Sequence, residues 1–225
     1  MVKCVVFDCD GVLVDAVSSW RTLHDHFGTN SDEAFSAFLR GEITDVEFMR
    51  IDIQLWKEVQ PEIHQDDIFR AFQGVKLMKG ARETVSELKS NGIYVAIVSA
   101  GVDIFVASIA AMLDVDDWIA NGFVFDDEGW LSGEGIARIR GSGKNVAIEK
   151  LIELNGFKSS EIYCIGDSDI DLSMKVEGSN FIGFNPSREK SVEAFNKAGV
   201  PIIYDKDLRL IWPFLFTGQD FPICK

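Results

Sequence analysis

The sequence predicts an α/β fold, a parallel sheet covered by helices on both faces, with an all-helical insertion near its start. Short apolar runs rich in Val and Ile recur along the chain, as is typical of strands buried in a parallel sheet. Stretches with the spacing of amphipathic helices separate these runs, and this alternation indicates a sheet between two helical layers. The alternation breaks over residues 16–77, where helical patterns follow one another without a strand pattern between them.

Individual elements can be placed along the chain from these patterns. Strands are expected at 2–7, 94–100, 162–167, 180–184 and 200–204. The helices that accompany them are expected at 81–91, 102–112, 145–155 and 187–198. Gly92 and Gly156 stand where two of these helices should end, because glycine readily adopts the left-handed conformation that closes a helix. The stretch 122–135 predicts a small β-hairpin that turns at residues 127–129.

The insertion divides the chain into a core of residues 1–15 and 78–225 and a helical cap of residues 16–77. Ser31 and Thr44 are expected to cap two of its helices, because a short polar side chain can accept a hydrogen bond from the first turn. A segment of this length is far longer than an ordinary connection between a strand and a helix. It is therefore expected over the carboxyl ends of the strands, where α/β proteins bind ligands.

The chain is strongly acidic: its 225 residues include 36 Asp and Glu against 22 Lys and Arg, a formal net charge of −14. Such a surface repels phosphate backbones and anionic membranes, so neither nucleic acid nor membrane is an expected partner. No apolar run is long enough to span a bilayer, and the cysteines show no metal-type pairing. These features favour a reduced, cytoplasmic protein, and they carry no signal for its oligomeric state.

Two acidic clusters follow expected strands directly. Asp8 and Asp10 come after the first strand, and residues two apart on an extended chain point the same way. Asp167 and Asp171 follow a later strand, in a segment that cannot be an EF-hand loop because Leu172 occupies the position of the required glycine. Four carboxylates gathered at one edge of a sheet would repel each other without a cation. Oxygen ligands with no nearby histidine favour Mg²⁺.

Two further residues fit an anion site at the same edge. Ser99 ends an expected strand, and its hydroxyl with the N–H groups of Ala100 and Gly101 can cradle an anion, although a serine here can also simply cap the next helix. Lys144 follows a Gly-Ser-Gly segment and precedes a helix, which suits a single cation reaching a phosphate. A Walker A loop is excluded, because Arg138 stands where its first glycine is required.

Taken in chain order, these motifs resemble those of the haloacid dehalogenase-like (HAD) superfamily. All four motifs are present: Asp8-x-Asp10, Ser99, Lys144, and Gly166-Asp167 followed by Asp171. The resemblance implies a Rossmann-like core, and an insertion between the first two motifs is typical of a C1 cap. Within the superfamily, the stretches VSAGVDIFVASIAAMLDVDDWIAN and DKDLRLIWPFL are similar to archaeal-type phosphoserine phosphatases.

That resemblance is incomplete at the positions that read the substrate. Val12 and Ile170 stand where the phosphoserine phosphatase pattern carries Thr and Asn, and Val17 stands where it carries a substrate-reading Glu. Arg50 is the nearest candidate for the cap arginine that would hold a substrate carboxylate. Val12, Leu13 and Val14, together with Val17, indicate a less polar pocket than serine needs, unless these side chains only pack the cap against the sheet.

The resemblance also implies a role for each motif. Asp8 is expected to attack phosphorus, giving an aspartyl-phosphate that water then hydrolyses, while Asp10 acts as general acid and then base. Asp171 is expected to orient Lys144 or a metal-bound water. The expected ligands of Mg²⁺ are Asp8, the backbone carbonyl of Asp10, and Asp167. The expected contacts to the transferring phosphoryl group are Lys144, Ser99, Ala100 and Gly101.

The predicted function is therefore Mg²⁺-dependent hydrolysis of a small phosphorylated metabolite, with phosphoserine as the first candidate. Other chemistries of C1-capped proteins remain open, namely phosphoglycolate hydrolysis and sugar-phosphate mutation. A third possibility is a degenerate, non-catalytic protein that binds a partner through its cap. The intact Asp8, Asp10, Lys144 and Asp167 argue against that third possibility.

Overall fold

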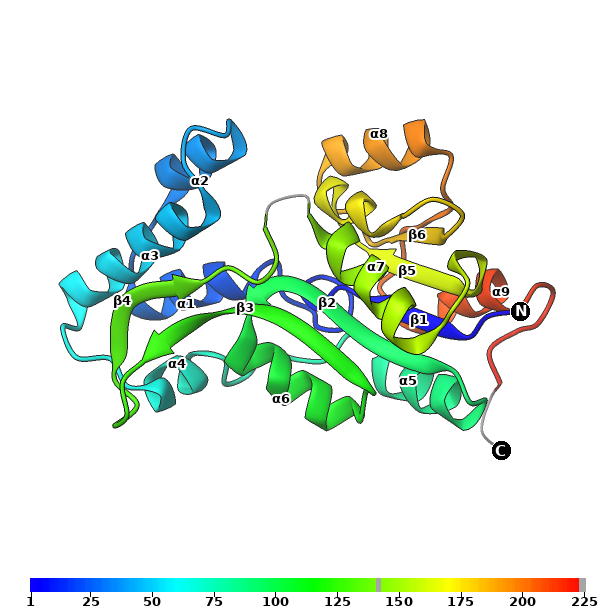
Figure 1. The fold of residues 1–225 in the computed structure, drawn as a ribbon, viewed down its shortest axis with the longest axis horizontal. Helices are drawn as coiled ribbons and strands as arrows, with labels where there is room; N and C mark the ends of the chain where they lie inside the picture. The colour runs from blue at the N-terminus through cyan, green and yellow to red at the C-terminus, as the bar shows by residue number, and fades with distance from the viewer. Residues whose placement is uncertain (141–142, 223–225) are drawn as a thin grey trace.

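A seven-stranded sheet forms the centre of the chain in a computed structural model that describes residues 1–140 and 143–222 (Figure 1). The strand order is β4-β3-β2-β1-β5-β6-β7, and every neighbouring pair is parallel except β3 and β4. The strands are β1 (Cys4–Phe7), β2 (Tyr94–Val102), β3 (Asp117–Phe125), β4 (Leu131–Ile136), β5 (Ile162–Gly166), β6 (Asn180–Phe184) and β7 (Ile202–Ile203). The predicted fold class is confirmed.

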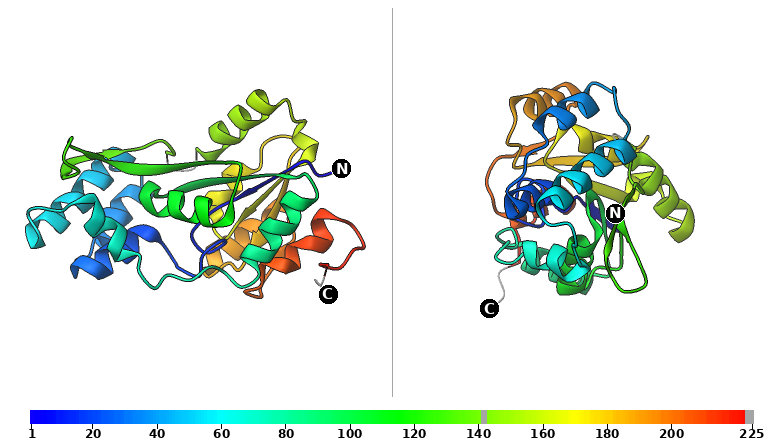
Figure 2. Two further views of the ribbon diagram at one scale, coloured as in Figure 1. Left: turned by 90° about the horizontal axis from the view of Figure 1, so that it is seen from below. Right: turned by 90° about the vertical axis from the view of Figure 1, so that its left-hand side faces the viewer.

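Helices cover both faces of this sheet. The two views of Figure 2 show this arrangement, and the packing of β1 agrees with it. Val5 and Phe7 belong to the apolar cluster under one helical layer, whereas Cys4 and Val6 belong to the cluster under the other. Alternate residues of a strand point to opposite faces, so β1 is buried on both sides. One layer contains α5 (Ala81–Ser90), α6 (Asp103–Leu113) and α9 (Trp212–Leu215), and the other contains α7 (Lys144–Asn155) and α8 (Glu189–Ala198).

Four helices form the insert after β1, and α5 then leads the chain back to the sheet at β2. Thr44 begins the longest of them with a full capping box, in which the Thr44 and Glu47 side chains each bond the other's backbone N–H. Ser31 stands at the start of the preceding helix, but its hydroxyl lies 2.9 Å from His24 Nε2 instead of capping. The four helices are α1 (Ser19–Phe27), α2 (Asp32–Leu39), α3 (Asp45–Val59) and α4 (Gln65–Ala71).

This helical insert is fastened to the β3–β4 hairpin, a link that the sequence did not predict. The Gln65 N–H donates to Gly129 O at 2.9 Å, and the Leu131 N–H donates to Ile63 O at 2.8 Å. Figure 1 shows the hairpin running alongside α3. The hairpin turns around Gly129, as expected, and its strands extend the sheet out to the insert. Among the described helices, none is long and apolar enough to cross a membrane.

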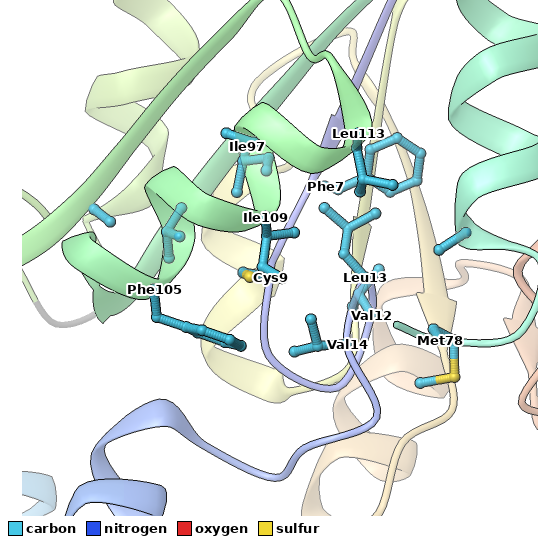
Figure 3. Packing of buried hydrophobic residues seen from close by; sticks show 14 of the residues in the cluster. Phe7, Cys9, Val12, Leu13, Val14, Met78, Ile97, Phe105, Ile109 and Leu113 are labelled. Carbon is cyan, nitrogen blue, oxygen red and sulfur yellow. The ribbon is translucent and has the colours of Figure 1, made fainter. Parts of the chain in front are cut away.

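The segment just after Asp10 belongs to the core of the protein. Val12, Leu13 and Val14 are fully buried, and Figure 3 shows them beside Met78 and facing α6. The Met78 N–H donates to Leu13 O at 2.8 Å. This bond joins the stretch where the chain leaves the sheet for the helical insert to the stretch where it returns. These three side chains therefore pack the segment that connects β1 to the helical insert. None of them lines the cavity described below, so they do not make it apolar.

Candidate active site

The predicted site residues of the core converge on one cavity of about 460 Å³ between the carboxyl ends of the strands and the helical insert. Asp8 directly follows β1, and its N–H donates to Ile165 O of the neighbouring β5 at 2.9 Å. Asp167 directly follows β5, so the two acidic clusters meet because their strands are neighbours. The cavity is lined by Asp8, Asp10, Ser99, Ala100, Gly101, Lys144, Asp167 and Asp171 at this end.

Lys144, the first residue of α7, lies at the centre of the site with only 2% of its surface exposed. Its Nζ lies 3.0 Å from Asp8 Oδ1 and 2.6 Å from Asp171 Oδ1. Burial by itself would lower the pKa of Lys144, but the two carboxylates outweigh it and raise the pKa well above its usual value. Lys144 is therefore a fixed positive charge. Residues 141 and 142 of the Gly-Ser-Gly segment before it lie outside the described residues.

Asp171 holds Lys144 in place from the loop after β5. One oxygen accepts from Lys144, and the other accepts from the Ser168 hydroxyl at 2.7 Å and the Ser168 N–H at 3.0 Å. Burial raises the pKa of Asp171, but Lys144 and Ser168 overcome that effect and lower it. A Cβ on Gly166 would lie 2.3 Å from the Asp171 Cβ, so only glycine allows this approach. Ser168 is a contributor that the sequence motifs did not reveal.

The carboxylates of Asp8, Asp167 and Asp171 offer oxygens within 4.8 Å of one another, a spacing that suits a metal ion. Burial raises the pKa of Asp8 to about 7, although Lys144 opposes it. Burial together with the charges of Asp171 and Asp8 raises the pKa of Asp167 to about 9. Buried carboxylates that resist ionisation in this way fit a divalent cation, whose charge would reverse both shifts. This group includes Asp171 and not the Asp10 side chain; Asp10 was expected to contribute its backbone carbonyl.

Asp10 is held apart from that cluster by the helical insert. Its Oδ2 accepts both the backbone N–H and the hydroxyl of Ser19, each at 2.7 Å, while its Oδ1 is buried without a hydrogen-bond partner among the described residues. Burial raises the pKa of Asp10 in spite of these bonds. Ser19 Oγ in turn accepts the Val102 N–H at 3.0 Å. Ser19 was missed from the sequence, where only its position at the start of a helical pattern marked it.

Ser99 lies inside β2, which continues to Val102 with a shift of register against β3. Its Oγ accepts the Gly101 N–H at 3.1 Å, and α6 begins without a side-chain cap from Ser99. A Cβ on Gly101 would lie 2.6 Å from Ser19 Oγ, so glycine lets the insert approach. The Trp20 indole N–H donates to Ala100 O at 2.9 Å and fixes the same loop from the insert side.

The positions expected to contact the substrate do not all lie at the cavity. Arg50 is exposed, pairs with Glu134 of β4 at 3.0 Å, and is not among the residues that line the cavity. Val17 and Ile170 do line it, without the polar groups of the phosphoserine phosphatase pattern. The structure thus brings together the expected catalytic set and leaves the expected cap arginine outside it.

Comparison with known proteins identifies the class. The family model of haloacid dehalogenase-like hydrolases matches residues 5–174, more than half of the chain. The chain belongs to this family, as its motifs predicted.

Within the family the chain is similar to phosphoserine phosphatases and is a phosphatase-type enzyme. It is 28% identical over 178 residues to the phosphoserine phosphatase of Methanocaldococcus jannaschii, covering 76% of this chain and 80% of that protein. It is 28% identical over 185 residues to that of Archaeoglobus fulgidus, covering 81% of this chain and 52% of that protein.

Solved structures share the fold. A substrate-bound phosphoserine phosphatase complex superimposes with a TM-score of 0.78 at 23% identity, covering 96% of this chain and 99% of that one. A phospho-aspartyl intermediate analogue of phosphoserine phosphatase gives a TM-score of 0.78 at 24% identity, covering 95% of this chain and 99% of that one.

Proposed function

We propose that the chain hydrolyses small phosphomonoesters with Mg²⁺ through an aspartyl-phosphate on Asp8. The observation that carries the proposal is the buried Lys144, held between Asp8 and Asp171 beside the crowded Asp167. A buried, fixed cation next to a carboxylate at the strand ends is suited to binding a phosphoryl group against the acidic background of the chain.

In the first step an Asp8 oxygen bonds to phosphorus while the bond from phosphorus to the ester oxygen breaks. Asp10 gives its proton to the departing oxygen. Its Oδ1 is the atom suited to hold that proton, since Oδ2 already accepts two hydrogen bonds from Ser19. In the second step water attacks the phosphorus, Asp10 takes a proton from that water, and the Asp8 carboxylate is released with inorganic phosphate.

Mg²⁺ would be held by Asp8, the backbone carbonyl of Asp10, and Asp167, and when bound it would neutralise charge on the phosphoryl oxygens. Asp171 is already committed to Lys144 and Ser168 and therefore positions the lysine. Lys144 and the Ser99–Gly101 segment would hold the remaining phosphoryl oxygens.

Residues 16–77 would act as a cap over a core of residues 1–15 and 78–225. In support, the cavity has walls from both parts, and the residues expected to bind the phosphoryl group all come from the core. A cap of this kind excludes bulk water from the reaction and contacts the leaving group. Phosphoserine is the first substrate to test, because relatives of this chain bear the name phosphoserine phosphatase.

The test is phosphate release from phosphoserine and a panel of other phosphorylated metabolites, with Mg²⁺ and then with EDTA. We expect turnover that EDTA abolishes and that Asp8→Asn removes. Asp15→Asn is the matched control, because Asp15 lies in the same segment but is exposed and pairs with Lys206 at 2.7 Å. Turnover that survives EDTA, or that survives Asp8→Asn, would refute the mechanism.

A further inference from the structure

The helical insert lines its end of the cavity with aromatic and apolar side chains, and also with the polar side chains of Ser18, Arg21, His24, Asn30, Ser31, Asp32 and Asp45. Phe38 and Phe48 stack with ring centroids 5.3 Å apart and an interplanar angle of 11°, and Phe35 lies 5.9 Å from Phe48. These rings come from α2 and α3, which face each other across this end. The apolar side chains lining it are Val17, Trp20, Phe35, Phe38, Phe48 and Met49.

Helix α2 shows that this apolar surface is only partly covered by the chain itself. Five of its eight residues are apolar, yet none of them is buried. Phe35 is 37% exposed although it lines the cavity. An amphipathic helix ordinarily buries its apolar face against the core, so one left partly uncovered marks a contact surface for something else.

Trp20 makes the apolar surface continuous with the phosphate-binding end. Its indole N–H is taken by Ala100 O, next to Ser99, so the ring is fixed as a wall beside the anion site. The ring also packs edge-on against Phe123 at 5.4 Å. A phosphoester whose phosphate lies at Lys144 therefore meets an indole ring as its leaving group extends toward the insert.

The charged groups that line this end, Arg21, Asp32 and Asp45, each have an interaction partner in the chain, although the Arg21 pairs are exposed to solvent. Arg21 lies 3.0 Å from Asp25 and 3.6 Å from Asp32, so its charge is balanced by two carboxylates. Arg188, at the opposite wall, lies 4.0 Å from Asp169. Asp45 stands at the start of α3. The ammonium and carboxylate of an amino acid would have to compete with these pairs, whereas an apolar group would cover surface that is now exposed.

We propose that the leaving group this site prefers is an apolar or aromatic alcohol and not an amino acid. This inference rests on the proposed phosphomonoester hydrolysis and names its substrate class. The phosphate end fixes the reaction, and the insert end selects the alcohol by burial of its apolar surface against Phe35, Phe38 and Phe48.

The test compares esters that differ only in the alcohol: 2-phenylethyl phosphate, ethyl phosphate, phosphoethanolamine and phosphoserine. All four are esters of aliphatic alcohols, each of which leaves with the proton from Asp10, so large differences in kcat/KM report the fit of the leaving group. We expect 2-phenylethyl phosphate to lead the other three at least tenfold. A lead by phosphoserine or phosphoethanolamine would overturn the inference while leaving the proposed hydrolysis intact.

Binding to the Asp8→Asn protein gives a measurement that does not need turnover. We expect calorimetry to show 2-phenylethyl phosphate binding at least tenfold more tightly than phosphoserine. Equal or weaker binding would overturn the preference, whatever the outcome of the hydrolysis assays. Failure of the proposed hydrolysis, by contrast, would appear as absence of phosphate release from every ester by the unmodified protein.

A pair of phenylalanine variants locates the preference. Phe48→Ala should lower the ratio of kcat/KM for 2-phenylethyl phosphate over ethyl phosphate at least fivefold. Phe69→Ala, on an exposed Phe of α4 that does not line the cavity, should leave that ratio unchanged. A ratio that stays the same in Phe48→Ala, or falls equally in both variants, would contradict the assignment of the leaving-group surface to α2 and α3.

Discussion

The two ends of the cavity depart in opposite ways from the usual pattern, in which charged side chains are exposed and apolar side chains are buried. At the core end, Lys144 is 2% exposed and lies among carboxylates. At the insert end, Phe35 is 37% exposed on a helix with no buried residue. Buried charge and exposed apolar surface both cost free energy in a folded chain. The core end is therefore held together by pairing within the chain, whereas the insert end is completed by what binds there.

The largest expected effect is a loss of activity when the proposed nucleophile at the core end is replaced. Asp8→Asn keeps the size of the side chain but removes the oxygen nucleophile, so kcat should fall on the order of 10⁴-fold or more. Steady-state phosphate release measures the loss. Residual activity within tenfold of the unmodified protein would show that Asp8 is not the attacking group.

Removing the buried cation should damage both activity and stability. Lys144→Met leaves Asp8 and Asp171 without their partner, and breaking a buried pair in this way costs about 3–5 kcal/mol. Urea unfolding measures the change. Lys150→Met is the control on the same helix, because Lys150 is exposed and pairs with Glu153, and it should cost less than about 1 kcal/mol.

Metal binding should stabilise the core end. Adding Mg²⁺ at about 100 times its dissociation constant should raise the free energy of unfolding by about 2.7 kcal/mol. Asp167→Asn should remove most of this increase, and Asp15→Asn should keep it. A Mg²⁺ effect of equal size in both variants would place the ion elsewhere.

The Ser19 hydroxyl links the two ends of the cavity, and removing it should have a smaller effect on activity. Ser19→Ala removes the hydroxyl that Asp10 Oδ2 accepts and that receives the Val102 N–H. We expect kcat to fall roughly tenfold, equivalent to about 1.4 kcal/mol, because the acid is less well oriented. Ser90→Ala is the control, because the Ser90 hydroxyl donates to Glu87 O at 2.9 Å at the end of α5 and does not contact Asp10.

The smallest effect on stability is expected at the insert end. Phe35→Ser should change the free energy of unfolding by no more than about 0.5 kcal/mol, since Phe35 lies outside the buried core. Phe7→Ala, in the fully buried β1, should cost about 3–5 kcal/mol by leaving a cavity. Comparable losses in the two variants would mean that α2 is packed in solution.

The sequence predicted much of the core end because Asp8, Ser99 and Asp167 stand at or directly after a strand. The apolar runs locate the strands, and the carboxyl ends of neighbouring parallel strands meet, so these residues could be grouped before their geometry was known. Lys144, at the start of α7, and its pairing with Asp171 were added through the resemblance to a known family. The bonds between Ser168 and Asp171 required the exact path of one short loop. That path depends on Gly166 admitting Asp171 closely, which motif spacing alone does not show.

The insert end was harder to predict because helix rotation decides which side chain faces the site. Arg50 and Met49 are neighbours in sequence, but successive residues of a helix point about 100° apart. Met49 accordingly lines the cavity, whereas Arg50 turns outward to Glu134. Ser19 and Trp20 escaped for a related reason: their partners, Val102 and Ala100, lie some eighty residues away along the chain.

Ser19 lies in the first turn of α1, and its hydrogen bonds tie that turn to Asp10, the proposed general acid. One hydroxyl joins Asp10, the start of the insert and the end of β2. Helix ends fray at a free-energy cost well below that of global unfolding. Each time this turn opens, Asp10 loses its two hydrogen bonds while the sheet stays folded. In the proposed mechanism, catalytic competence therefore depends on the local stability of one helical turn, whose lifetime is separate from the stability of the whole fold.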